Sequence, residues 1–323
     1  MMVSPMRRRY LFTLLGAAVL GSGGFLGLSC VLSRGNVPSY EVRLAPSANR
    51  KFVVFGDSRR TLTAEFWRKQ YDAERALVIR ALAGEDPAFI LNTGDLVSHG
   101  ADPEDWRVFH SDNRPIFDKK IPYYAGLGNH EYYGDNDRAL ANYFALFPHL
   151  EGRKWYEIRF APVLLIVLDS NFDELERWEV EAQGKWFVKQ LEAAERDASI
   201  RHVLLTCHHA PYTNSLIHGD SLPVQEYFVS RKTPKVRAFI TGHVHSYERF
   251  VRDGVQFVVS GGGGAPLTAV DVEAPEHKDE YKGPAYRSFH YLRFTVNGDR
   301  LACDVVMLQD DKSWKRVDGF ECP

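Results

Sequence analysis

The feature that most constrains the fold is a series of short apolar segments, each followed within a few residues by a polar cluster. These clusters are Gly56-Asp57-Ser58-Arg59, Gly94-Asp95-Leu96, Gly128-Asn129-His130-Glu131, Cys207-His208-His209 and Gly242-His243-Val244-His245. Continuous apolar segments of this length are typical of strands that are buried on both faces. In an open α/β sheet, ligands bind beyond the carboxyl ends of the strands. The pattern therefore predicts an α/β fold in which separate loops converge on one site.

The order of the expected elements indicates how the sheets are covered. Helices are expected at 64–82 and 176–198, among strands such as 51–55, 89–91, 163–168, 202–207 and 236–240. The C-terminal part alternates like strands, with a hairpin turn at Asn297-Gly298. We expect a four-layer α/β/β/α sandwich of two mixed sheets flanked by helices, as a single catalytic domain over residues 51–323.

The N-terminal residues 1–35 are predicted to lie outside this domain. Arg7-Arg8-Arg9 precedes an apolar run from Tyr10 to Leu32, the layout of an export signal, and Arg8-Arg9 resembles a twin-arginine signal. The run is also long enough, at about 20 residues, to remain as a membrane anchor. We expect an exported protein facing the periplasm or the extracellular side, with 36–50 as a linker. A buried N-terminal helix is the alternative interpretation.

Composition restricts the possible partners. With 45% hydrophobic and 25% charged residues the chain is an ordinary globular protein, and its net charge of −2 gives no electrostatic case for nucleic acid as a partner. Cys303 and Cys322 could form a disulfide in an oxidising compartment, or remain as buried thiols. The sequence does not indicate an oligomeric state.

The residue types in the clusters favour metal binding. His243 and His245 are two residues apart, so both imidazoles project to one side of extended backbone. Together with carboxylate and amide oxygens they form a donor set suited to two transition-metal ions, rather than to calcium or a thiolate zinc site. Asp95 is the central candidate for a carboxylate shared by both ions. The competing interpretation is that these residues form turns and loops without a metal.

Two closely spaced ions suit phosphoryl chemistry. A pair about 3.5–4 Å apart can clamp a phosphoryl group and lower the pKa of a bridging water, which then attacks phosphorus as hydroxide. His130, next to Asn129, is a candidate for protonating the leaving oxygen or stabilising charge. The expected substrate is therefore a phosphate ester.

The motifs resemble those of the calcineurin-type metallophosphoesterases, and most of all the purple acid phosphatase branch. That family has GD, GDxx, GNH[ED], a histidine after a strand, and GHxH, in this order. The similarity covers about residues 50–265 and extends through Gly242-His243-Val244-His245-Ser246-Tyr247-Glu248-Arg249. It implies one metal site at Asp57, Asp95 and His245, and another at Asp95, Asn129, His208 and His243. It implies iron with zinc or manganese, although the ligand set alone does not choose the metal.

The resemblance also assigns two further histidines. The ligand histidine of the family lies four residues before a tyrosine, here Tyr212, which favours His208 over His209. His218, ten residues beyond His208, matches a histidine that contacts phosphate in plant relatives.

Two positions depart from the family pattern. Arg59 stands where the general family has a histidine, and Ser98 stands where purple acid phosphatases have a metal-binding tyrosine. The site at Asp57, Asp95 and His245 therefore lacks a ligand. His99 or a water could replace it, or the ion at that site binds weakly. Arg59 could hold a phosphate oxygen or form a surface salt bridge. Without the tyrosine, we expect no tyrosinate-to-iron colour.

These observations predict an exported, dinuclear-metal phosphoesterase that uses a metal-bound hydroxide. One alternative is a phosphodiesterase acting on nucleotides, lipid head groups or wall polymers. The other is a degenerate relative that binds metal or phosphate without turnover, an interpretation motivated by Arg59 and Ser98.

Overall fold

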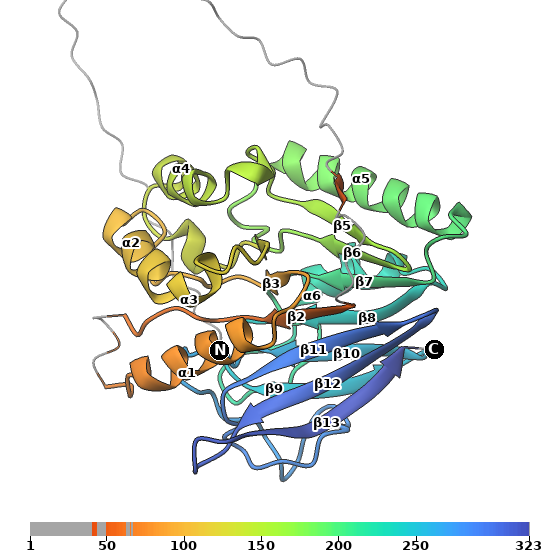
Figure 1. Ribbon diagram of the computed structural model, residues 1–323. Helices are drawn as coiled ribbons and strands as arrows, with labels where there is room; N and C mark the ends of the chain where they lie inside the picture. Colours follow the sequence, from red (N-terminus) through yellow and green to blue (C-terminus); the bar gives the residue numbers. More distant parts are fainter. Residues whose placement is uncertain (1–40, 44–49, 63–64, 66, 323) are drawn as a thin grey trace, which may run out of the picture. The chain divides into compact units, whose positions relative to one another are not determined.

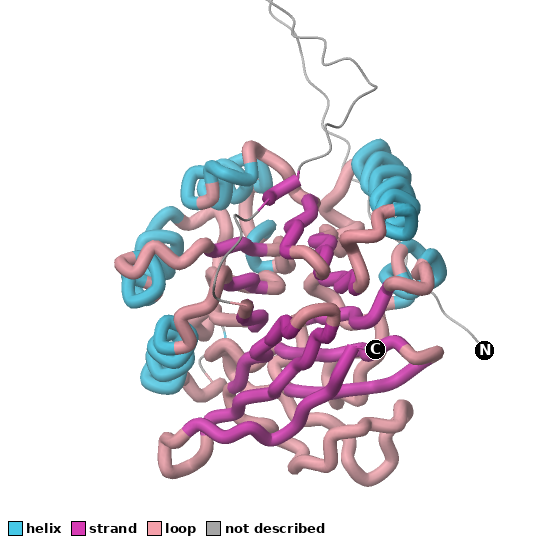
Figure 2. The backbone as a smooth tube through the Cα atoms, turned by 45° about the vertical axis from the view of Figure 1, so that its right-hand side comes forward, coloured by secondary structure: helices cyan, strands magenta, loops and turns pink. Residues whose placement is uncertain are grey.

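Two mixed β-sheets pack face to face in the computed structural model, and helices cover the outer face of each (Figures 1 and 2). The structure describes residues 41–43, 50–62, 65 and 67–322. The described residues all belong to one compact unit. The expected four-layer α/β/β/α sandwich is confirmed. The export signal expected at 1–35 lies outside the described residues.

The larger sheet has seven strands in the order β1-β5-β6-β7-β8-β10-β9. They are β1 (Glu41–Arg43), β5 (Tyr156–Phe160), β6 (Val163–Val167), β7 (His202–Thr206), β8 (Val236–Thr241), β9 (Tyr247–Arg252) and β10 (Val255–Ser260). Strand β1 lies within the stretch expected to be a linker, and it pairs in parallel with β5 at the sheet edge. A three-residue strand is too short for hydrophobic periodicity to reveal it.

The smaller sheet has six strands in the order β13-β12-β11-β2-β3-β4. They are β2 (Lys51–Phe55), β3 (Ile90–Asn92), β4 (Tyr123–Ala125), β11 (His290–Asn297), β12 (Arg300–Leu308) and β13 (Trp314–Cys322). The hairpin between β11 and β12 closes on the pair Asn297 and Arg300, so its loop is Gly298-Asp299, one residue later than expected. Cys303 and Cys322 are buried free thiols on β12 and β13, not a disulfide.

Helices cover the two sheets on opposite sides. On the side of the smaller sheet lie α1 (Asp72–Gly84), α2 (Pro103–Asp112), α3 (Arg114–Phe117) and α4 (Asn136–Leu146), and on the other side lie α5 (Arg177–Arg196) and α6 (Leu222–Tyr227) (Figure 2). Helix α1 begins later than the sequence predicted. The Glu65 carboxylate accepts a hydrogen bond from the Leu62 N–H at 2.9 Å, which holds that stretch in a turn.

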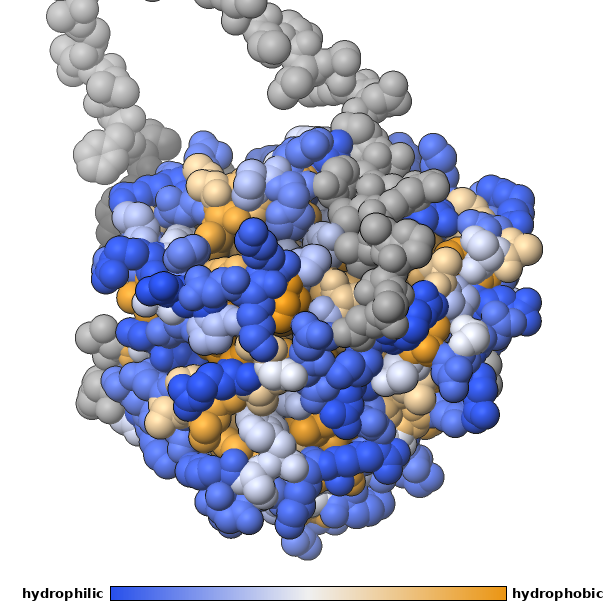
Figure 3. Space-filling view, in the orientation of Figure 1, coloured by the Kyte–Doolittle hydropathy of each residue, from blue (hydrophilic) through white to orange (hydrophobic). Residues whose placement is uncertain are grey.

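Strand β6 shows why continuous apolar segments form the centre of this fold. Its side chains alternate between two cores, one between the sheets and the other beneath α5. Val163 and Val167 belong to the first core, and Leu164 and Ile166 to the second. Each fully buried aliphatic side chain stabilises the fold by roughly 1.5–3 kcal/mol. The face drawn in Figure 3 is mostly hydrophilic, with apolar residues in small separate areas.

The strand directions bring the polar clusters together. Strands β2, β3 and β4 are mutually parallel, as are β7 and β8 in the other sheet. The loops after these strands carry the polar clusters identified in the sequence. No helix among the described residues is long and apolar enough to cross a membrane.

Candidate active site

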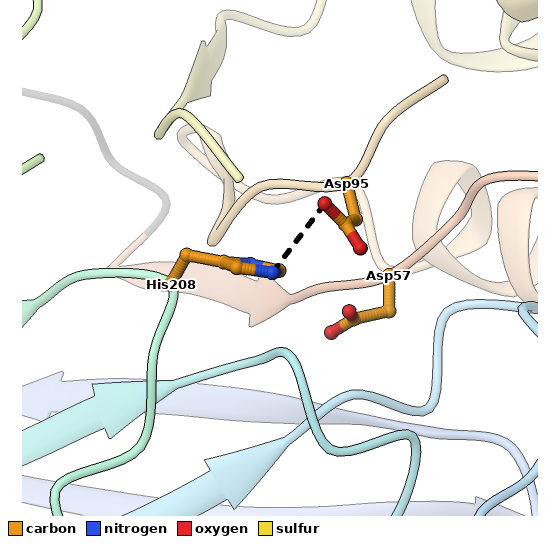
Figure 4. Close-up of side chains that lie close together, drawn as sticks. All are labelled: Asp57, Asp95 and His208. Carbon is orange, nitrogen blue, oxygen red and sulfur yellow. Dashed lines mark ion pairs between the residues drawn. The ribbon is translucent and has the colours of Figure 1, made fainter. Parts of the chain in front are cut away.

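Two buried carboxylates stand at the centre of the site. Asp57 follows β2 and Asp95 follows β3, and these residues are 0% and 1% exposed. Both have left-handed backbone, with φ of 60° and 58°, a conformation that Asp tolerates better than most residues. Figure 4 shows both carboxylates near the His208 ring, and donor atoms of these three residues all lie within 4.8 Å of one another. Such a group can hold a cation.

Backbone hydrogen bonds hold the carboxylate loops together. The buried Glu131 carboxylate accepts the N–H groups of Asp95 at 2.8 Å and Gly128 at 2.7 Å, which ties the loop after β3 to the loop after β4. Gly94 has φ of 109°, and a Cβ there would lie 2.5 Å from the Gly128 nitrogen. The glycines of these motifs thus allow two loops to approach within backbone contact.

Three donor atoms converge beside Asp95 Oδ1 and make a group of four with it. The Asn129 Oδ1 lies 3.2 Å from His208 Nε2 and 3.1 Å from His243 Nδ1. The two imidazole nitrogens are 3.2 Å apart, and Asp95 Oδ1 lies 3.4 Å from His208 Nε2. Donors around one ion at about 2.1 Å are separated by roughly 3.0–3.4 Å. The spacing of the four atoms therefore fits a single shared cation.

Hydrogen bonding of His208 supports the same conclusion. Its Nδ1 lies 3.2 Å from the Thr93 carbonyl oxygen, so a proton assigned to Nδ1 is donated there. The Nε2 lone pair then faces the oxygens of Asn129 and Asp95, which also carry lone pairs. A cation between them resolves this repulsion. Burial lowers the pKa of His243 well below its usual value, which favours the neutral ring that binds metals.

The second half of the site is formed by Asp57, His245 and the shared Asp95. The His245 Nδ1 donates to the Pro266 carbonyl at 2.7 Å, which leaves Nε2 facing Asp57 Oδ1 at 3.5 Å. Burial lowers the pKa of His245 to about 4, so its ring is neutral near pH 7. The Asp57 carboxylate also accepts the His243 N–H at 3.1 Å. These residues suit a second cation but offer fewer protein donors than the first cluster.

Arg59 lies against this second half. Its side chain is 4% exposed, and its Nε lies 3.8 Å from Asp95 Oδ2. Both terminal nitrogens donate to the Glu65 carboxylate, at 2.9 and 3.2 Å. The Arg59 guanidinium was expected to hold a phosphate oxygen or form a surface salt bridge. It instead forms a salt bridge with the partly buried Glu65 carboxylate.

Ser98 and His99 do not supply the ligand that the Asp57 and His245 site lacks relative to the family. The Ser98 hydroxyl donates to the Arg60 carbonyl at 2.6 Å. His99 is exposed, and its ring packs against Tyr133 at 6.4 Å. Neither arrangement brings a donor to Asp57 or His245, so His99 does not take the place of the absent ligand in this structure.

The two remaining catalytic candidates border the metal cluster. His130 Nδ1 lies 2.7 Å from the Ser98 carbonyl oxygen, and Nε2 lies 3.8 Å from Asp95 Oδ2. The His218 ring packs on His243 with 4.4 Å between ring centroids. His209 Nδ1 is instead 2.9 Å from the Ser170 hydroxyl. This arrangement leaves His208, not His209, within reach of both Asn129 and Asp95.

The charges of the two central carboxylates differ. Burial raises the pKa of Asp57 to about 7. Burial by itself also raises the pKa of Asp95, but His208, His130 and Arg59 more than offset this and hold it below its usual value. Asp95 is therefore the carboxylate that remains ionised, as a ligand shared by two cations must.

The structure brings together all the residues expected to bind metal: Asp57, Asp95, Asn129, His208, His243 and His245. Sequence reasoning missed the groups that orient them. Backbone carbonyls of Thr93 and Pro266 carry no sequence signal, and Glu65 is recognisable only once Arg59 is seen to be buried.

A model of the calcineurin-like phosphoesterase family matches residues 50–247, more than half of the chain. The chain belongs to the calcineurin-like phosphoesterase family. The matched span of this calcineurin-like phosphoesterase includes both carboxylate loops and ends just beyond His245, so it contains the whole candidate metal cluster.

Curated relatives point to the purple acid phosphatase branch. Purple acid phosphatase 4 of Arabidopsis thaliana is 24% identical over 270 residues, covering 73% of this chain and 76% of the relative. Purple acid phosphatase 1 of Ipomoea batatas is 35% identical over 104 residues, or 30% of this chain and 20% of the relative. Together with the family match, they identify this calcineurin-like phosphoesterase as a metal-dependent phosphoester hydrolase that is similar to purple acid phosphatases.

Solved structures share the fold. Purple acid phosphatase PPD1 from yellow lupin (Lupinus luteus) seeds has a TM-score of 0.63 at 17% identity, covering 85% of this chain and 54% of the lupin chain. This chain thus spans about half of the lupin protein. Plasmodium GAP50, the anchor in the inner membrane complex, has a TM-score of 0.60 at 16% identity, covering 83% of this chain and 88% of that chain.

Proposed function

We propose that this calcineurin-like phosphoesterase is exported, binds two divalent or trivalent metal ions and hydrolyses phosphate esters. The observation that carries the proposal is the cluster of Asn129, His208 and His243 around Asp95, with donor atoms 3.1–3.4 Å apart. A mixed set of imidazole, amide and carboxylate donors suits iron, manganese or zinc. Asp57 and His245 would complete the second site.

The protein side chains divide the work of hydrolysis. When bound, the ions would polarise the phosphoryl group and lower the pKa of a water. His130 is held through Nδ1 by the Ser98 carbonyl, so its Nε2 is the atom able to carry a proton to the leaving oxygen. Burial lowers the pKa of His130 to about 4, so the ring carries a proton mainly in acidic solution, where it would act as a proton donor. His218, beside His243, would contact a phosphate oxygen.

Hydrolysis of aryl phosphates tests this function. Chelator-treated protein should be inactive, and added iron, manganese or zinc should restore hydrolysis of an aryl phosphate monoester. Asn129→Ala and His243→Ala should abolish turnover while the protein stays folded. His209→Ala is the matched control, since this ring contacts Ser170 and lies beside the cluster. Full activity of either ligand variant would refute the ligand assignment, and faster hydrolysis of the diester would indicate a phosphodiesterase instead.

Export is proposed from the sequence of the N-terminal residues alone. The basic Arg7-Arg8-Arg9 and the apolar run from Tyr10 to Leu32 support a twin-arginine-type signal or a membrane anchor. Substitution of Arg8 and Arg9 by lysine should retain the protein in the cytoplasm of a bacterial host. Unchanged fractionation of this variant would contradict the proposed route.

A further inference from the structure

Exposed apolar side chains gather on loops beside the candidate site. Leu216 is 62% exposed, Ile217 is 64% exposed and Tyr286 is 65% exposed. Large apolar side chains exposed singly are ordinary, but a contiguous group beside a site indicates a binding surface. The question is therefore whether these three side chains form one surface.

Backbone pairing answers this. The Leu216 N–H donates to the Ala269 carbonyl at 3.0 Å, and Ser215 pairs antiparallel with Val270. Ala269 in turn pairs antiparallel with Tyr286. Leu216, Ala269 and Tyr286 are thus direct neighbours across three short extended segments, and such neighbours project to one face. Val270 follows Ala269, so its side chain points to the opposite face, and it is buried. The row of Leu216, Ala269 and Tyr286 therefore lies on the outer face.

We call this row, together with the exposed Ile217 that follows Leu216 in the same loop, the apolar stripe, and its loops meet the metal cluster at two points. The Ser215 hydroxyl accepts the N–H groups of Ile217 at 3.3 Å and His218 at 3.2 Å, which folds the loop so that His218 meets His243. At the other point, His245 Nδ1 donates to the Pro266 carbonyl, and the Thr268 N–H donates to the His245 carbonyl at 3.0 Å. At each point only a few residues separate the stripe from the site, and even when extended they span no more than about 10 Å.

We propose that the apolar stripe of Leu216, Ile217, Ala269 and Tyr286 binds the organic part of the substrate, and that the substrates are phosphate esters of long apolar alcohols. The inference rests on the proposed function. A phosphate held at the metal cluster directs its ester carbon chain outward, and the stripe is the adjoining surface at His218 and His245. A short alcohol ends before it reaches the stripe, whereas a long alkyl chain lies along it.

The specificity of hydrolysis tests the stripe. Metal-loaded full-length protein is assayed with ethyl, butyl, octyl and dodecyl phosphate below their micelle concentrations. Complete burial of one methylene strengthens binding about fourfold. A methylene that lies on an open surface gains about half of that free energy, which strengthens binding roughly twofold. We expect kcat/KM for dodecyl phosphate to exceed that for ethyl phosphate at least about tenfold, through KM, because ground-state and transition-state binding improve together.

Variants separate the stripe from general apolar surface. Leu216→Ser, Ile217→Ser and Tyr286→Ser combined should reduce the dodecyl preference to about threefold or less and leave ethyl phosphate hydrolysis unchanged. The control combines Trp178→Ser and Leu222→Ser, which are similarly exposed at 59% and 67% but lie on α5 and α6. This control should keep the wild-type preference.

The outcomes distinguish the two proposals. If ethyl phosphate and aryl phosphates are not hydrolysed at all, the proposed function fails, and the substrate inference falls with it. If short esters are hydrolysed with no gain from chain length, or if the triple variant keeps the preference, the stripe proposal alone is refuted. A preference that appears only when phospholipid vesicles are added would assign the stripe to a lipid surface and would also refute it.

Discussion

Replacing Arg59 by glutamine should strengthen metal binding at the proposed second site, formed by Asp57, His245 and the shared Asp95. Arg59 is the one departure from the family ligand set that puts a fixed positive charge beside the cluster, with Nε 3.8 Å from Asp95 Oδ2. A cation at Asp57 and His245 has to share Asp95 with this guanidinium. The structure therefore predicts two unequal sites, with the ion bound by Asn129, His208 and His243 held more tightly.

The distances give the size of this effect. Two unit charges 3.8 Å apart interact by roughly 4 kcal/mol at an effective dielectric constant of 20. The Glu65 carboxylate, 2.9 Å from Arg59 Nη1, neutralises most of the guanidinium charge toward the site. We expect about 1–2 kcal/mol to remain, so Arg59→Gln should raise the affinity of the weaker site about five- to thirtyfold. Glu65→Gln removes the neutralising carboxylate and should lower that affinity instead.

Calorimetric titration of metal-free protein with zinc or manganese measures both binding steps directly. Arg60→Gln is the matched control, because it removes the same charge one residue along, from a side chain that is 43% exposed and paired with Asp112 at 3.1 Å. Far-UV circular dichroism checks that each variant is folded. The reasoning is refuted if Arg59→Gln leaves the weaker step unchanged, or if Arg60→Gln strengthens it equally.

Further perturbations test other parts of the site. His130→Ala should slow aryl phosphate turnover by about 10²–10⁴-fold, the usual loss of a general acid, and a smaller loss would argue against that role. Gly242→Ala places a Cβ 2.4 Å from Asp57 Oδ2 and should lower turnover about 10²-fold. Calorimetric titration should show that this variant has lost metal affinity at the weaker site. Burial lowers the pKa of His290 to about 4 in the folded protein. As the pH falls, His290 therefore takes up a proton in the unfolded chain before it does so in the folded protein. This difference should lower the free energy of unfolding by up to about 3 kcal/mol between about pH 6.5 and about pH 4. His290→Asn should lose this part of the acid sensitivity in urea unfolding at pH 7 and 4.5, and an unchanged slope would contradict it. Iron-loaded protein should show no tyrosinate absorption band, because Ser98 occupies the tyrosine position, and a purple preparation would disprove that alignment.

The positions of the metal-binding candidates were predictable because each follows a continuous apolar strand. The segment Val163–Val167 illustrates the rule, since five buried apolar residues in succession form a strand with a core on each face. Asp57 and His243 follow strands of different sheets, β2 and β8, yet both strands end at the site, where the His243 N–H reaches the Asp57 carboxylate. Strand order was not needed for this prediction, only strand direction.

The surroundings of these residues were not predictable from residue types. Arg59 was expected to bind phosphate or form a surface salt bridge, yet it is buried against Glu65 because the stretch between them turns instead of starting α1. His99 was a candidate ligand by sequence position, but its ring lies on Tyr133. Both outcomes depend on where a loop folds back, and hydrophobic periodicity carries no information on this.

The polypeptide itself fixes the geometry of the candidate site. Asp57, Asp95 and His243 all have positive φ, a strain that costs on the order of 1–3 kcal/mol for each residue and persists only where the surroundings enforce it. Carbonyl groups of Thr93 and Pro266 orient the rings of His208 and His245. These contacts are made between protein groups alone, so the donor atoms are already spaced for a cation. Binding energy then need not be used to order the ligands, and the folding energy of the two sheets stabilises the arrangement instead.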